Sequence, residues 1–229
     1  MRVIVATYNT HGGVGLDRRF APQRIARVIR ELDADIVALQ ELDFRTGADM
    51  LDILREKTGM HAVAAHTFRR RDGAFGNGLL SRFPILETET IDLSVDGREP
   101  RNAIHARIDC EGIALRIFAT HFGLRAIERT EQAARLLTAL ARHRRDAQVL
   151  AGDINEWSVP QRALRILHAH FGESPARRTY PTVLPAFALD RIWASPASAL
   201  VRVHVHKSPL ARLASDHLPL LAELRLEAG

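Results

Sequence analysis

The sequence of 229 residues contains 46% hydrophobic and 26% charged residues, which are ordinary values for a globular protein and exclude disordered and fibrous classes. Its formal net charge of +5 favours polyanionic partners, namely nucleic acid, anionic lipid headgroups or phosphorylated metabolites, without choosing among them. No apolar run is long enough to cross a bilayer, and the single cysteine excludes an internal disulfide and fits a reducing compartment. We therefore expect a cytoplasmic protein without a transmembrane segment, and we expect it to be monomeric.

Apolar runs of strand length recur along the chain, and period-3.6 patterns lie between some of them. The periodic patterns predict a helix over residues 22–32, with Pro22 at its start, and another over residues 130–143. A shorter helix is predicted over residues 160–168, opening at Pro160. The apolar runs predict strands at residues 2–7, 35–40, 78–81, 103–108, 113–119, 148–151, 189–194 and 218–226.

The order of these patterns predicts the fold class. The first part of the chain alternates strand and helix, whereas from about residue 75 to residue 120 strand follows strand, and Cys110-Glu111-Gly112 is typical of a hairpin turn. This mixture favours an α/β (α+β) fold in which helices cover mixed sheets, rather than a pure βαβ wind. No linker, fixed-period repeat or low-complexity tract interrupts the sequence, so we predict a single domain over residues 1–229.

Acidic, amide and imidazole side chains follow several predicted strands directly. They are Asn9, Glu41, His121, Asp153 with Asn155, and Asp190. Strand ends that meet at one edge of a sheet are where α/β proteins build sites. One such acid is usually only a helix cap or a turn former. Five such strand ends, together with the Asp216-His217 pair, indicate a functional site.

These residue types suit hydrolysis at phosphorus. Mg²⁺ or Mn²⁺ prefers oxygen ligands and is commonly held by one or two carboxylates with waters and substrate phosphate, a role that Glu41 suits. Asp153 suits holding or deprotonating the attacking water. Asn9 and Asn155 are neutral donors that can contact phosphate without adding negative charge.

One histidine and one arginine also fit hydrolysis at phosphorus. Either Asp190 or Asp216 can polarise the imidazole of His217, which then becomes a donor that faces phosphate. Arg101, which precedes an apolar strand, presents its guanidinium to phosphate or forms a surface ion pair, and the sequence leaves both interpretations open.

Seven short segments carry these residues in a fixed order across nearly the whole chain. They are Thr7-Tyr8-Asn9-Thr10-His11, Leu39-Gln40-Glu41, Gly76-Asn77-Gly78-Leu79-Leu80-Ser81-Arg82, Thr120-His121-Phe122, Gly152-Asp153-Ile154-Asn155, Leu189-Asp190-Arg191-Ile192 and Ser215-Asp216-His217. Each segment alone is a weak signal, but the ordered set resembles the endonuclease/exonuclease/phosphatase superfamily. That superfamily includes deoxyribonuclease-I-like nucleases, abasic-site endonucleases, neutral sphingomyelinases and inositol-polyphosphate 5-phosphatases. The resemblance implies a four-layer α/β/β/α sandwich with two mixed β-sheets.

The resemblance also implies a metal site and a water site. Asn9 and Glu41 would line a site for Mg²⁺ or Mn²⁺, and Asp216 would lie beside the metal. Asp153 and Asn155 would position the attacking water and the phosphate. The position of His11 varies among members, so the resemblance assigns it no role.

Two histidines receive roles in the same way. His217, paired with Asp190, would contact a phosphoryl oxygen. His121 matches a histidine of deoxyribonuclease- and sphingomyelinase-like members, whereas abasic-site endonucleases place a tyrosine there. An acidic partner is expected for His121, and Asn77 stands near the place where that partner belongs. Asn77 and Arg101 are the candidate substrate-binding residues.

Three other patterns suggest different chemistry. Cys110 and Arg116 have the spacing of a cysteine-phosphatase loop, but the segment between them has a strand-turn-strand pattern, so we interpret Cys110 as a core or edge residue. Glycine-rich residues 12–15 lack the rest of a dinucleotide fingerprint and are interpreted as turn glycines. His204 and His206 form either a candidate zinc pair or a solvated strand face.

The sequence predicts the reaction more firmly than the substrate. A nonspecific nuclease needs only cations beside a groove, and Arg69-Arg70-Arg71 would serve. A lipid phosphodiesterase needs an exposed apolar lip, for which Phe122, Trp157 and Phe187 are candidates. Our first hypothesis is therefore a metal-dependent phosphodiesterase acting on nucleic acid or phospholipid. The alternatives are a phosphomonoesterase acting on a small phosphorylated metabolite or inositol phosphate, and a non-catalytic phosphate-binding module.

Overall fold

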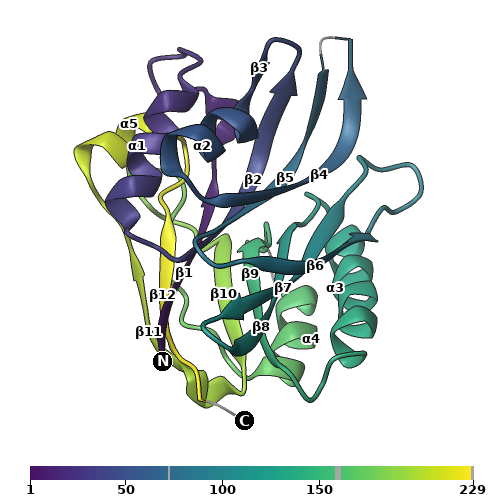
Figure 1. Cartoon of the computed structure of the whole chain (residues 1–229). Helices are drawn as coiled ribbons and strands as arrows, with labels where there is room; N and C mark the ends of the chain where they lie inside the picture. Colours follow the sequence, from purple (N-terminus) through teal and green to yellow (C-terminus); the bar gives the residue numbers. More distant parts are fainter. Residues whose placement is uncertain (72, 158–160, 228–229) are drawn as a thin grey trace.

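The computed structural model describes residues 1–71, 73–157 and 161–227 of the chain (Figure 1). Two β-sheets lie face to face, and helices cover their outer sides. The first sheet has the strand order β11-β12-β1-β2-β5-β4, with β3 paired to β2. The second has the order β10-β9-β8-β7-β6. Both sheets are mixed, because β1 and β2 run parallel in one, β8 and β9 run parallel in the other, and the remaining pairs are antiparallel.

The bounds of the elements follow in chain order. The strands of the first sheet are β1 (Arg2–Asn9), β2 (Ile36–Arg45), β3 (Ala48–Asp49), β4 (His61–Arg70), β5 (Gly73–Ser81), β11 (Leu200–Val205) and β12 (Leu220–Arg225). Those of the second are β6 (Ile85–Asp92), β7 (Asn102–Cys110), β8 (Ile113–His121), β9 (Ala147–Asp153) and β10 (Asp190–Ser195). The α-helices are α1 (Pro22–Leu32), α2 (Met50–Thr58), α3 (Ala126–Ala141), α4 (Arg162–Phe171) and α5 (Pro209–Ala214), with short 3₁₀ turns η1 (His11–Gly13) and η2 (Ala197–Ala199).

Three apolar clusters hold the four layers together. The largest lies between the sheets and takes alternate residues of each strand, such as Val3 and Val5 of β1. The intervening residues Ala6 and Tyr8 of the same strand pack on the opposite face, under α1, α2 and α5. The third cluster lies between the second sheet and helices α3 and α4. The predicted α/β/β/α sandwich with two mixed sheets is therefore confirmed.

Helix α1 has the predicted bounds, because its buried stripe and Pro22 at its first position are both explicit in the sequence. Helix α3 begins at Ala126, before the predicted residue 130, because Glu128 accepts a hydrogen bond from the Arg125 backbone N–H and extends the helix by a polar first turn. Helix α4 runs to Phe171, and its predicted opening at Pro160 lies outside the described residues. No helix in the described part of the chain is long and apolar enough to span a membrane.

The predicted hairpin at Cys110 is confirmed. Cys110 pairs with Ile113, so the loop has two residues. Glu111 and Gly112 both have positive φ, at 52° and 89°, as a type I′ turn requires. Cys110 itself is fully buried in the cluster between the sheets, as expected for a core residue.

Gly152 is needed where β8 and β9 approach each other. A Cβ atom at this position would lie 2.0 Å from the carbonyl oxygen of Thr120, which is a backbone atom that cannot move aside. We expect Gly152→Ala to lower the free energy of unfolding by more than about 3 kcal/mol, the upper end of the usual cost of overpacking, and to displace the adjacent Asp153. Urea unfolding measures the change. Gly97→Ala is the control, because its Cβ meets no atom and only the positive φ of 69° costs about 1–2 kcal/mol. Equal losses in both variants would contradict the steric argument.

Candidate active site

The strand ends that carry the predicted site residues meet at one edge of the sandwich. Asn9 ends β1, His121 ends β8 and Asp153 ends β9. Asp153 is in register with His121 on one side and with Asp190 on the other. A cleft of about 550 Å³ opens over this row. The predicted residues that line it are Glu41, Arg101, His121, Asp153, Asn155, Asp216 and His217.

Glu41 reaches the cleft because β2 is bulged at this point. The register with β5 shifts between Leu39 and Leu42, so two residues of β2 oppose one residue of β5. Glu41 has a left-handed backbone, with φ of 57°, which costs a non-glycine residue about 1–2 kcal/mol. Asn155 is also left-handed, with φ of 53°. Such strain concentrates at functional sites, where the surrounding packing enforces it.

Asn9 links two carboxylates. Its Nδ2 donates to Glu41 Oε1 at 2.9 Å and to Asp153 Oδ2 at 3.1 Å. The backbone N–H of His11 donates to Asn9 Oδ1 at 3.0 Å, and this bond fixes the orientation of the amide. The amide nitrogen of Asn9 therefore holds Glu41 and Asp153 together. Asn9 lies beside Glu41, and its predicted place in the metal site stays a prediction.

Asp153, His217 and Asp190 form a buried row of charges. His217 Nδ1 lies 2.9 Å from Asp190 Oδ2, and His217 Nε2 lies 3.7 Å from Asp153 Oδ2. Burial lowers the pKa of His217, but the carboxylates of Asp190 and Asp153 outweigh it and raise that pKa to about 10. Burial raises the pKa of Asp153 to about 7 against the opposing effect of the His217 charge. The imidazole of His217 is therefore a cation at neutral pH.

Asp190 does not line the cleft. It is fully buried, and Thr179 Oγ1 donates to its Oδ2 at 2.5 Å, beside the contact from His217. Of the two acids that the sequence left open as the partner of His217, the geometry favours Asp190.

Among the residues that the structure describes, no carboxylate contacts His121 Nδ1. The guanidinium of Arg101 lies there instead, with Nη1 at 3.2 Å, and Asp153 Oδ2 lies 3.7 Å from Nε2. Burial, with Arg101 and His217 nearby, lowers the pKa of His121 well below its ordinary value, so the ring is neutral. A guanidinium and an amide nitrogen can only donate, so both ring nitrogens of His121 lie beside donors, Nδ1 beside Arg101 and Nε2 beside Asn155. Asn155 Nδ2, 3.0 Å from the same Nε2, donates to the carbonyl of Phe122.

Asn77 lies beneath the cleft and does not line it. Its Nδ2 donates to the backbone oxygen of Asn102 at 3.2 Å and to the side-chain oxygen at 2.9 Å, which ties β5 of one sheet to β7 of the other. A Cβ at Gly76 would lie 2.2 Å from a backbone oxygen, and one at Gly78 would lie 2.4 Å from Leu42. The segment 76–78 is thus shaped by close packing. The predicted substrate contact of Asn77, and its place beside His121, are corrected to an inter-sheet support.

Glu41 and Asp216 provide the oxygens that suit a divalent cation. Their side chains are partly exposed, and Glu41 Oε2 and Asp216 Oδ2 lie 3.8 Å and 3.4 Å from the same atom, His11 Nδ1. Two accessible carboxylates at an open cleft fit the preference of Mg²⁺ or Mn²⁺ for oxygen. Among the described residues, the group of three metal-capable side chains whose ligand atoms lie within 4.8 Å of one another is Asp153, Asp190 and His217. In this group the His217 ring lies between the two carboxylates, with Nδ1 2.9 Å from Asp190 and Nε2 3.7 Å from Asp153.

The rim of the cleft is partly apolar. Trp157 and Phe187, two of the three candidates for an apolar lip, are 45% and 46% exposed and line it. The guanidinium carbon of the buried Arg129 lies 5.0 Å from the Trp157 ring. Phe122, the third candidate for the lip, is instead fully buried and packs in the core under α3.

Several residues of the site were not predicted. The Tyr180 ring lies 4.8 Å from the His217 ring, and Glu99 binds the guanidinium of Arg101 at 2.8 Å. Both line the cleft, and Thr179 supports Asp190 from behind. All three belong to segments outside helices and strands, so no periodicity marks them.

The competing sequence patterns have structural explanations. His206 Nε2 lies 2.9 Å from Glu31 Oε2, which favours a solvated strand face over a zinc pair. Arg116 pairs with Asp146 and has no anion loop beside it, because it lies within β8. Gly12 and Gly13 have φ of 61° and 72° in the turn after β1, which is the role of turn glycines. In the predicted cationic segment Arg69 and Arg71 are exposed, and the side chain of Arg70 lies outside the described part of the chain.

The fold and the converging strand ends define a deoxyribonuclease-I-like sandwich. Residues 6–217 match the Endonuclease/Exonuclease/phosphatase family, and the chain therefore belongs to that family of metal-dependent phosphoesterases. The chain is 33% identical to the uncharacterized protein YbhP of Escherichia coli over 247 aligned residues, which cover 97% of this chain and 96% of YbhP.

Solved structures share the fold at lower sequence identity. An endonuclease/exonuclease/phosphatase from Beutenbergia cavernae is 24% identical with a TM-score of 0.76, and the match covers 98% of this chain and 72% of that one. A mannosyl-6-phosphatase from Bacteroides thetaiotaomicron is 21% identical with the same TM-score of 0.76, over 98% of this chain and 100% of that one. At these identities the likeness shows the fold alone.

Proposed function

We propose that this protein is a Mg²⁺- or Mn²⁺-dependent phosphodiesterase that hydrolyses a phosphate ester of nucleic acid or phospholipid by attack of water. The observation that carries the proposal is the environment of Asp153. This buried carboxylate has a pKa of about 7, with the imidazolium of His217 on one side and the neutral imidazole of His121 on the other. A base whose pKa lies near the working pH is suited to accepting a proton from water.

Each remaining group has a role around that base. His217, held as a cation by Asp190, donates from Nε2 toward the charge that develops on the phosphoryl oxygens. The neutral ring of His121 lies beside Asp153 in the same cleft, and Asn9 keeps Asp153 oriented. Glu41 and Asp216 would hold the divalent cation, which when bound neutralises negative charge on the phosphate.

Two features support a diester rather than a monoester. The guanidinium of Arg101 is already paired with Glu99 at 2.8 Å, so this arginine offers little spare positive charge to a phosphate dianion. The apolar rim formed by Trp157 and Phe187 leaves contacts for organic groups on the phosphate. A phosphodiester, with one negative charge and two organic substituents, matches both features.

The direct test compares bis-p-nitrophenyl phosphate with p-nitrophenyl phosphate at saturating Mg²⁺ or Mn²⁺. We expect faster release of nitrophenolate from the diester, its loss in EDTA and its return when metal is added. Hydrolysis that EDTA does not suppress would contradict the metal-dependent mechanism. A preference for the monoester would support the phosphomonoesterase instead, and no turnover of either ester would support a phosphate-binding module.

Glu41→Gln tests the assignment of the metal site. We expect the metal concentration for half-maximal activity to rise at least about tenfold, because one anionic ligand is lost while the side chain keeps its size. Titration of activity with Mn²⁺ measures it. Glu99→Gln is the matched control, since Glu99 lines the same cleft but binds Arg101. An equal rise in both variants would show that general cleft charge, rather than a ligand, is responsible.

A further inference from the structure

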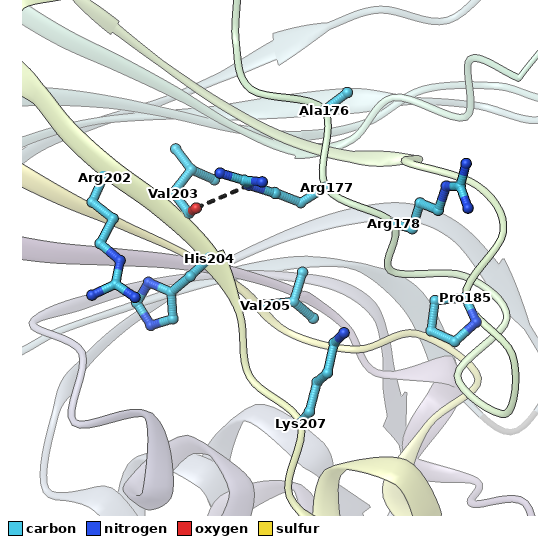
Figure 2. A pocket seen from close by; sticks show the side chains of 9 residues that line it. All are labelled: Ala176, Arg177, Arg178, Pro185, Arg202, Val203, His204, Val205 and Lys207. Carbon is cyan, nitrogen blue, oxygen red and sulfur yellow. Dashed lines mark hydrogen bonds between the residues drawn. The ribbon is translucent and has the colours of Figure 1, made fainter.

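A second cavity, of about 700 Å³, lies beside the edge strand β11 and is lined by basic side chains (Figure 2). We call it the basic groove, and its cations are Arg177, Arg178, Arg202 and Lys207. In Figure 2, Arg202 and His204 lie toward one end and Arg178 and Pro185 toward the other, with Arg177 and Lys207 between them. All four cations are exposed, and none of the described residues that line the groove is acidic.

The charges of the groove are not neutralised by the protein. Within the described ranges none of its four cations forms an ion pair, although many other arginines do so, such as Arg24 with Asp17. Glu223 is opposite Arg202 in the neighbouring strand and feels its charge, but the Glu223 carboxylate binds Arg2 at 2.8 Å. Arg177 Nε donates to the carbonyl of Val203 at 3.1 Å, a contact that fixes its guanidinium without a carboxylate. Four cations without an ion pair around one concave surface favour an anionic ligand with several charges.

One segment of chain, residues 178–187, contributes residues to both the groove and the active-site cleft. Arg178 lines the groove and lies two residues before Tyr180, which lines the cleft. The Tyr180 ring lies 4.8 Å from the His217 ring. Pro185 likewise lines the groove two residues before Phe187, which lines the cleft. Two residues span at most about 7 Å, so the backbone of each pair lies between the two cavities.

The segment is held firmly in place. Tyr180 and Phe187 bond to each other through their backbones, with Phe187 N donating to Tyr180 O at 2.8 Å. Thr182 N donates to the carbonyl oxygen of Asp216 at 2.7 Å, and Leu218 N donates to that of Thr179 at 3.0 Å. A ligand that occupies both cavities therefore meets a fixed ridge rather than a mobile loop.

We infer that the basic groove binds backbone phosphates of a single-stranded polynucleotide whose scissile phosphodiester lies in the cleft. This inference rests on the proposed phosphodiesterase function and narrows its substrate to nucleic acid. A polynucleotide carries regularly spaced negative charges that can extend from the cleft into the groove, whereas a phospholipid headgroup carries its charge at one place. The half-exposed rings of Trp157 and Phe187 at the cleft offer surfaces on which unpaired bases stack. Single-strand binding commonly combines such stacking with a cationic groove.

The test uses a variant that neutralises the groove, Arg178→Gln with Arg202→Gln and Lys207→Gln. Its matched control is Arg30→Gln with Arg144→Gln and Arg145→Gln. The control removes the same charge from exposed residues that precede β2 and β9, at the edge of the sheets opposite the cleft. Fluorescence anisotropy of a labelled single-stranded oligothymidylate, in EDTA so that no turnover occurs, gives Kd for each protein across a salt series.

We expect the groove variant to bind the oligothymidylate at least about tenfold more weakly than the unmodified protein. Because each phosphate contact to a single strand contributes about 0.7 to the salt dependence, the slope of log Kd against log salt should fall by about 2. The control should bind with nearly the original Kd and slope. Turnover of bis-p-nitrophenyl phosphate should be unchanged in both variants, since this small diester does not reach the groove, and this also shows that both are folded.

Three results would overturn the inference. The first is an unchanged Kd for oligothymidylate in the groove variant, and the second is an equal loss of affinity in both variants. The third is that the groove substitutions weaken binding of phosphatidylserine vesicles or duplex DNA but leave binding of the single strand unchanged. Groove-dependent oligothymidylate binding without turnover of any ester would leave the groove assigned and refute the proposed hydrolase. Normal turnover with unchanged binding in the groove variant would refute the groove alone.

Discussion

Asp153→Asn is expected to lower kcat/KM for bis-p-nitrophenyl phosphate about 10²–10⁴-fold, which is the usual contribution of a general base. An asparagine keeps the shape of the side chain and can still accept the hydrogen bond from Asn9 Nδ2, but it cannot take a proton from water. Initial rates at saturating metal measure the loss. A variant that keeps more than about a tenth of the original activity would remove Asp153 from the role of base.

The same substitution is expected to stabilise the metal-free protein above neutral pH. Burial raises the pKa of Asp153 from 3.8 to about 7, so the folded protein holds this proton more tightly than the unfolded chain does. The carboxyl group therefore contributes stability at acidic pH that is lost as the pH rises from about 4 through about 7. Asparagine stays neutral throughout. At pH 8 we expect Asp153→Asn to raise the free energy of unfolding by about 1–3 kcal/mol, with Asp190 still opposite His217.

Urea unfolding in EDTA at pH 5 and pH 8 measures this difference. The gain should be present at pH 8 and much smaller at pH 5, where the native carboxyl is protonated. Asp17→Asn provides a comparison of opposite sign, because the hydrogen bond from Arg24 lowers the pKa of Asp17 to about 2 and its charge favours the folded state. If Asp153→Asn were less stable than the unmodified protein at pH 8, burial of the ionised Asp153 carboxylate would not destabilise the folded protein.

The sequence predicted the interior of the sandwich better than its edges. Strands with continuous apolar runs, such as β1 and β9, were found, because both of their faces are buried. The strands β4, β6 and β11 were missed. Each lies at a sheet edge, and β6 reads Ile85-Leu86-Glu87-Thr88-Glu89-Thr90-Ile91-Asp92 with mostly exposed side chains. An edge strand needs no apolar run, so its pairing is decided by its neighbour and not by its own composition.

The candidate site was predictable where polarity changes at a strand end. Asp153 and His121 are marked by the apolar residues before them, and register alone brings them together. The orientation of Asn9 was not predictable, because it depends on a backbone bond from His11. The contact of Arg101 with His121 depends on how the segment between β6 and β7 packs against β8. Asn77 was predicted to contact the substrate, but its side chain bonds to Asn102 beneath the cleft. The sequence does not separate these two roles, because an asparagine between two glycines can support a site or line it.

Asp190→Asn is expected to lower kcat about 10²–10⁴-fold with little change in KM, the range for loss of a group that supports acid–base chemistry. Asp190 is fully buried and touches His217, not the cleft, so it acts as a positioning residue. Its carboxylate accepts from His217 Nδ1 and helps to hold that imidazole as a cation. An amide of the same shape offers no negative charge, and its nitrogen can turn toward His217 and oppose the contact. Because a charged donor matters most as charge develops on the phosphate, the loss should fall on kcat.

Thr179→Val separates the charge of Asp190 from its placement. The Thr179 hydroxyl donates to the same Oδ2 atom, and valine keeps the volume of the side chain while removing that bond. We expect a loss of kcat of less than about tenfold, because the carboxylate and its contact with His217 remain. Steady-state kinetics on bis-p-nitrophenyl phosphate, with urea unfolding to monitor the fold, give both values. Equal losses in the two variants would mean that Asp190 acts through packing alone, whereas a larger loss in Asp190→Asn at similar stability assigns the effect to the charge that faces His217.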